Sequence, residues 1–248
     1  CMASRHSMDL TEGSVMKKLI QFTFPILLSS LLQQFYSAAD TIFVGQFAEK
    51  QDLAAVGSTG SISALILTLF MGLATGGAVV TSQYLGARKY DDAQKSVGQL
   101  TMMAAVIGIA FGLLCLILAR PIMKLFFGAI EAPVMEAGLI YFRITALSFP
   151  FIALYSTVGA VFRSMGNSKL TMKLSFLMNI INVVGNAVCI IGFKMGVAGV
   201  AIPTLISRVV AALLSILFLC RRKQELYLEG KYLFHLRPDM MKKILRIG

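Results

Sequence analysis

Long apolar stretches without a charged residue recur along the chain. Four of them lie between charged positions, namely Asp52 to Arg88, Lys95 to Arg120, Arg143 to Arg163 and Lys173 to Lys194. A bilayer-spanning helix needs about 20 mostly apolar residues, and a charge at its centre is costly, so each stretch predicts one span. Two further stretches, Lys18 to Glu49 and Lys194 to Arg221, are interrupted only by Asp40 and Arg208. The pattern therefore predicts six spans.

We expect the six helices at about residues 17–46, 54–84, 95–119, 137–162, 168–193 and 197–220, with a longer connection at 121–133. Pro25, Pro150 and Pro203 fall inside the first, fourth and sixth helices, where each removes a backbone hydrogen bond and favours a kink. We take Pro25 as a candidate hinge. Small residues at four-residue spacing predict close helix packing, at the pairs Gly72 with Gly76 and Gly108 with Gly112.

Composition supports an all-α polytopic membrane protein. Of the 248 residues, 57% are hydrophobic and only 14% are charged. A soluble all-helical protein is the alternative, but buried core helices rarely exceed twenty residues without a charge.

The formal net charge of +11 follows the predicted topology. Twelve cationic residues lie at the N-terminus and in every second connection: Arg5, Lys17, Lys18, Arg88, Lys89, Lys95, Arg163, Lys169, Lys173, Arg221, Arg222 and Lys223. The other connections hold four: Lys50, Arg120, Lys124 and Lys194. By the positive-inside rule both ends of the chain are cytoplasmic and the protein is a multi-pass plasma (inner) membrane protein. The charge then requires no nucleic-acid partner.

The chain divides into three predicted parts: an N-terminal cytoplasmic tail at 1–16, a six-helix lobe at 17–220 and a cytoplasmic linker at 221–248 on the membrane surface. Met16 to Leu19 reads MKKL, and Met241 to Ile244 reads MKKI. Because transporters are often built from repeated halves, we expect a second lobe to follow the linker. We also expect Met8 to be the natural start, with residues 1–7 additional and without a cleavable signal peptide.

Polar side chains inside the predicted spans are the candidate site. Asp40 lies midway along the first helix, where a carboxylate costs about 2.5–3.5 kcal/mol on insertion scales. Gln33 and Tyr36 share its helical face, at spacing i, i+3 and i+7, so all three can point into one cavity. A lone acid in such a cavity is typical of a proton or cation site.

The fifth helix carries a second polar stripe, Asn179, Asn182 and Asn186, with the same spacing. These carboxamides serve either as interhelical contacts or as part of the site around Asp40. Thr204 on the sixth helix can line the same cavity. Arg208, one turn further, offers the alternative of a static ion pair with Asp40.

Motifs of enzymes are missing from the sequence. It contains no GxxxxGK[ST], HExxH or GxSxG pattern, and its two histidines, His6 and His235, lie in the tail and the linker. Its four cysteines form no CxxC pair. We therefore expect no enzyme, no cofactor and no catalytic metal, but transport driven by an ion gradient.

Several stretches, in order along residues 10 to 220, resemble the multidrug and toxic compound extrusion (MATE) transporters. They read LTEGSVMKKLIQFTFPILLSSLLQQFYSAADTIFVG, LAAVGSTG, GLATGGAVVTSQYLGARKYDDAQKSVGQ, FRSMGNSK and GVAGVAIPTLIS. The resemblance implies one six-helix lobe of a twelve-helix, two-lobed antiporter. Such an antiporter exports cationic amphipathic compounds in exchange for protons or sodium ions.

The resemblance also implies roles for individual residues. Asp40 matches the family's membrane-embedded acid, Gln33 a polar neighbour, and Asn182 and Thr204 polar positions lining the same cavity. Many relatives carry aspartate where this chain has Asn186, so Asp40 becomes the main titrating group, with H⁺ or Na⁺ as coupling ion. A lipid-linked oligosaccharide flippase of the same MOP superfamily and a non-transporting membrane scaffold remain as alternatives.

Overall fold

The computed structural model describes residues 15–128, 131–221, 225–233 and 237–248, and these residues contain helices and no β-strand. The expectations for residues 1–7, for His6 and for His235 lie outside the described residues, as does nearly all of the tail at 1–16.

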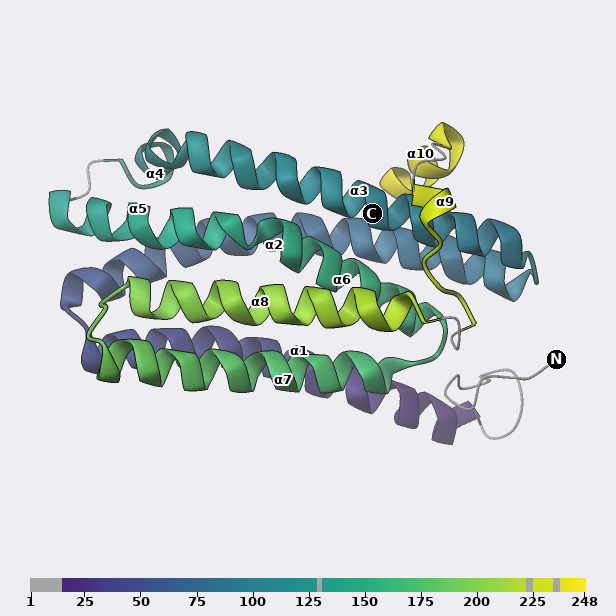
Figure 1. The fold of residues 1–248 in the computed structure, drawn as a ribbon, viewed down its shortest axis with the longest axis horizontal. Helices are drawn as coiled ribbons and strands as arrows, with labels where there is room; N and C mark the ends of the chain where they lie inside the picture. The colour runs from purple at the N-terminus through teal and green to yellow at the C-terminus, as the bar shows by residue number, and fades with distance from the viewer. Residues whose placement is uncertain (1–14, 129–130, 222–224, 234–236) are drawn as a thin grey trace.

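Long helices run side by side along the longest axis of the molecule (Figure 1). They are α1 (Val15–Phe47), α2 (Lys50–Gly86), α3 (Tyr90–Ile117), α7 (Ser168–Asn186) and α8 (Ala198–Leu219), with the bent pair α5 (Ala132–Leu147) and α6 (Phe149–Ser164). The π-helix η1 (Ala187–Gly192) continues α7. The six predicted helices are present with ends that differ from prediction by a few residues, except that the fourth, predicted as one helix at 137–162, is divided into α5 and α6.

Four helical segments are long and apolar enough to cross a membrane: α2, α3, α7 together with η1, and α8. The α5–α6 pair adds a fifth when it is taken as one span. Helix α1, the first of the six predicted spans, is 33 residues long but is not in this set. Its middle carries Gln33, Gln34 and Asp40, which lower its hydropathy.

The predicted kink at Pro150 is confirmed. Helices α5 and α6 meet at Ser148 with a bend of 46°, and Pro150 lies in the first turn of α6, where its missing N–H is tolerated. Gly108 of α3 packs against this break, since a Cβ atom there would lie 2.8 Å from the Cα of Pro150. The predicted role of this glycine in close packing is therefore supported. Pro25 and Pro203 are accommodated within α1 and α8.

The predicted connection at 121–133 contains a short helix, α4 (Ala119–Phe127). Its Ala119 and Met123 are buried, while Arg120 is exposed. The four-residue spacing of the buried pair explains why this segment folds as an amphipathic helix against the bundle.

The C-terminal segment is docked on the bundle. It contains α9 (Gly230–Leu233) and α10 (Pro238–Ile247), which pack against α3 and, for α10, also α2 (Figure 1). Met240 and Ile244 of α10 are buried. A Cβ atom at Gly76 would lie 2.4 Å from the Ile244 carbonyl oxygen, so this small residue of α2 allows the close approach.

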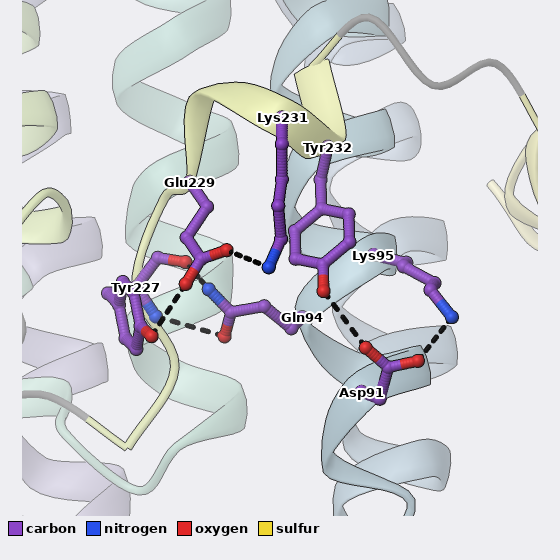
Figure 2. A network of polar contacts seen from close by, with 7 residues as sticks. All are labelled: Asp91, Gln94, Lys95, Tyr227, Glu229, Lys231 and Tyr232. Carbon is purple, nitrogen blue, oxygen red and sulfur yellow. Dashed lines mark hydrogen bonds and ion pairs between the residues drawn. The ribbon is translucent and has the colours of Figure 1, made fainter.

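Two glutamines of α3 hold the segment by its backbone. The Gln94 amide donates to the Tyr227 carbonyl and accepts from the Tyr227 N–H (Figure 2). The Gln99 amide donates to the Tyr232 carbonyl at 2.9 Å and accepts from the Arg237 N–H at 3.0 Å. Each glutamine thereby satisfies backbone groups that a loop would otherwise leave to water.

Side chains complete this network. The Tyr232 hydroxyl donates to Asp91 at 2.9 Å, and Lys95 also binds Asp91 (Figure 2). Lys231 contacts Glu229 at 2.6 Å, and this hydrogen bond raises the pKa of Lys231. The expected surface linker is thus fastened to the start of α3.

The double variant Gln94→Leu/Gln99→Leu should release the C-terminal segment, because four hydrogen bonds to its backbone are lost. We expect faster tryptic cleavage after Lys231 in the full-length protein in detergent. Gln83→Leu is the control, since Gln83 is exposed near the same end of the bundle. Equal cleavage rates of the double variant and the control would show that Gln94 and Gln99 do not hold the C-terminal segment.

Candidate functional site

Asp40 is the centre of a buried polar cluster between α1, α7 and α8. Its side chain is 4% exposed. Oδ1 accepts hydrogen bonds from Nδ2 of Asn182 at 3.1 Å and from Nδ2 of Asn186 at 2.7 Å. Oδ2 accepts from the Thr204 hydroxyl at 3.1 Å. Both carboxylate oxygens are therefore bound by neutral donors.

The geometry of α7 and α8 brings these donors together. Asn182 and Asn186 are four residues apart and lie on one face, with Nδ2 of Asn186 3.4 Å from Oδ1 of Asn182. Helix α7 ends at Asn186, where the π-helix η1 begins, and such π-turns are frequent at functional sites. Gly185 lets α8 approach closely beside Pro203, which sets Thr204 next to Asn182, whose Nδ2 donates to the Thr204 hydroxyl at 3.2 Å.

Tyr36 lies one helical turn before Asp40 and is also buried against α8. Its hydroxyl is 2.7 Å from the Ser207 hydroxyl and donates to the Thr204 carbonyl at 3.2 Å. The phenol thus fixes the position of α1 against α8 at the level of the cluster.

Arg208 does not form the ion pair that we considered as an alternative. Its Nη1 donates to the Ser148 hydroxyl at 2.7 Å, and its guanidinium carbon lies 5.8 Å from the centre of the Tyr36 ring. The ion pairs of the described residues include none with Asp40. The guanidinium acts on the carboxylate only through space.

Two predicted members lie away from Asp40. Gln33 lines a separate cavity between α1, α2, α6 and α7, and Asn179 donates to the Ser175 carbonyl of its own helix at 2.9 Å. Gln33 is seven residues from Asp40, which is about 10 Å along the helix axis, whereas Asn179 is only three residues from Asn182 and bonds to its own helix instead. A shared face therefore does not put them in a shared cavity. Pro25 is further still along α1 and is buried.

Three neighbours were not predicted: Tyr141, Ser148 and Ser207. Ser207 follows Thr204 by three residues, so the i, i+3 spacing could have identified it. Tyr141 and Ser148 belong to the α5–α6 pair, which carries no comparable polar stripe. Only the packing of α5 on α8 brings them near the site.

The cluster can hold a proton or a small cation. Oδ1 of Asn186 is buried and has no hydrogen-bond partner among the described residues. Carboxylate, carboxamide and hydroxyl oxygens are the ligands that hard cations prefer. The described residues contain no group of three His, Cys, Asp or Glu side chains suited to a resident metal ion.

A bundle of apolar helices around an enclosed carboxylate with neutral partners is the architecture of an integral membrane transport protein. The chain belongs to the MatE family, whose model matches residues 25–188. Members of this family are transporters and not enzymes.

Known proteins that resemble the chain agree. "Uncharacterized transporter YisQ" of Bacillus subtilis (strain 168) is 32% identical over 93% of this chain and 50% of its own length. "Multidrug export protein MepA" of Staphylococcus aureus (strain MRSA252) is 26% identical over 96% of this chain and 52% of its own. The chain thus spans about half the length of these relatives.

Solved structures share the fold. A MOP superfamily transporter from Pyrococcus furiosus Vc1 (DSM3638) superposes with a TM-score of 0.90 at 22% identity, covering 100% of this chain and 54% of that one. MATE in the bent conformation gives a TM-score of 0.88 at 24% identity, covering 95% and 52%. The all-α polytopic fold predicted from the sequence is therefore confirmed.

Proposed function

We propose that the chain forms one lobe of a cation-coupled antiporter that exports cationic amphipathic organic compounds, with Asp40 as the coupling carboxylate. One observation carries this proposal: Asp40 is buried within the bundle and is bound by three neutral donors rather than by a cationic side chain. A buried acid held in this way can exchange one cation for another. An acid locked in an ion pair cannot do so without breaking the pair.

Charge balance gives the mechanism. When Asp40 takes up a proton or a sodium ion, the cavity becomes neutral and its hold on a cationic substrate weakens. A protonated Asp40 needs an acceptor for its new O–H, and the unpartnered Oδ1 of Asn186 can supply one after a small rotation. Because Asn186 is uncharged, one carboxylate serves this lobe.

Movement of the lobe couples export of the organic compound to entry of the proton or sodium ion. Loss of charge on Asp40 changes its bonds to α7 and α8, which favours a different bend of α1 around Pro25. We further propose that α9 and α10 lead into a second six-helix lobe, that both ends of this chain are cytoplasmic in the plasma membrane, and that the two lobes rock about a central site.

The test is efflux of ethidium from vesicles that contain the full-length protein, with a pH gradient and a sodium gradient imposed separately. We expect one gradient to drive efflux against the ethidium concentration gradient, and that gradient identifies the coupling ion. The control is the same vesicle with both gradients collapsed by ionophores. Failure of both gradients to move ethidium or a second cationic dye would contradict the proposal.

A further inference from the structure

A second cavity, of about 150 Å³, lies between α1, α2, α6 and α7, away from Asp40. Its polar lining includes Ser29 and Gln33 of α1, Thr75 of α2, Tyr155 and Arg163 of α6 and Thr171 of α7. The lining contains one arginine and no carboxylate. The cavity is therefore lined by positive charge, whereas the Asp40 cluster carries negative charge.

Arg163 reaches this cavity because of Gly159. The two residues are one helical turn apart on α6, and a Cβ atom at Gly159 would lie 3.4 Å from Nη1 of Arg163. The guanidinium therefore lies over a gap in its own helix. No ion pair or side-chain hydrogen bond of Arg163 occurs within the part of the chain that the structure describes.

The floor of the cavity offers further donors. Ser29 is 7% exposed, and its hydroxyl has no hydrogen-bond partner among residues 15–128, 131–221, 225–233 and 237–248. Ser168 and Thr171 are buried on the α7 side. The buried, unpartnered hydroxyl and the unpaired guanidinium line one cavity, and they are two groups that an anion would satisfy.

The rim of the cavity is exposed, unlike its buried floor. Gln33, Met71 and Thr75 line the cavity and are exposed, so the cavity opens between α1 and α2. Ile26 and Met71 add apolar surface beside the polar groups. The space suits a compact charged group that enters with an apolar chain attached.

We propose that this cavity binds the anionic group, phosphate or carboxylate, of an amphipathic molecule, with Arg163 as its charged ligand and Ser29 as a hydrogen-bond donor. Guanidinium binds both anions through two parallel N–H bonds, which are stronger than bonds between neutral groups. This anion site does not depend on ion coupling at Asp40. A negative result in the binding test would therefore leave the proposed antiport function unaffected.

The test is binding of the fluorescent carboxylate 11-(dansylamino)undecanoic acid to the full-length protein in phosphatidylcholine nanodiscs. We expect decyl phosphate to compete and decanol not to compete. Arg163→Gln should raise the Kd of the probe at least about tenfold, as for the loss of a charge-assisted pair. Gly159→Ala, which keeps the charge but crowds the guanidinium, should weaken binding less.

Arg120→Gln is the matched control, because Arg120 is an exposed arginine of α4, and α4 lies at the opposite end of the bundle from the C-terminal end of α6 (Figure 1). Weaker probe binding in phosphatidylglycerol nanodiscs would assign the site to a lipid headgroup, whereas equal binding would assign it to a free amphipathic anion. Wild-type affinity in Arg163→Gln, with a melting temperature like that of the control, would overturn the proposal. Equal competition by decanol would overturn it as well.

Discussion

Asp40→Asn is expected to abolish gradient-driven efflux by the full-length protein while leaving its insertion in the membrane intact. The substitution keeps the size of the side chain but removes the only group of the cluster that can carry a negative charge. A neutral amide has no charge for a proton or sodium ion to neutralise. Substrate export is then no longer coupled to entry of the ion. The measurement is ethidium efflux per unit of protein in the membrane, under the gradient that drives the wild type.

Glu136→Gln is the matched control for this experiment. Glu136 is an exposed acid of α5, so the variant removes one carboxylate without touching the cluster. We expect efflux close to wild type. Normal efflux by Asp40→Asn would contradict the assignment of Asp40 as the coupling carboxylate. Loss of the Asp40→Asn protein from the membrane fraction would show that Asp40 has a structural role instead.

The positions of the helices were predictable because charges are expensive in the bilayer. Stretches free of charge predicted α2, α3 and α7 almost directly, and a stretch interrupted only by Arg208 predicted α8. The bend between α5 and α6 was predictable from Pro150, though its exact place at Ser148 was not. The docking of the C-terminal segment was not predicted, because it depends on the glutamine side chains of α3 and on contacts far apart in the sequence.

The cluster around Asp40 was predictable from polar residues that have no reason to face lipid. Asp40, Asn182, Asn186 and Thr204 do converge. Spacing along a helix gives the face of a side chain but not its depth in the bundle. Gln33 lines another cavity and Asn179 bonds to its own helix, while Arg208 bonds to Ser148 at a helix break that no periodicity marks.

The approach of α8 to α7 depends on the missing side chain of Gly185. A Cβ atom at this position would lie 2.6 Å from the Cβ of Pro203, closer than such atoms ever come. Pro203 immediately precedes Thr204, the donor to Oδ2 of Asp40. Any displacement of α8 at this point therefore changes the cluster as well as the packing.

Gly185→Ala is expected to destabilise the protein and to impair efflux together. Overpacking a close contact costs about 1–3 kcal/mol, whereas alanine at an open helical site gains up to about 1 kcal/mol over glycine. Gly57→Ala on α2 is the control, since its new methyl group meets nothing within 4 Å. We expect the melting temperature to fall for Gly185→Ala and to stay or rise for Gly57→Ala. If Gly185→Ala keeps both wild-type stability and efflux, α7 and α8 are not held at this contact, and the position of Thr204 must have another cause.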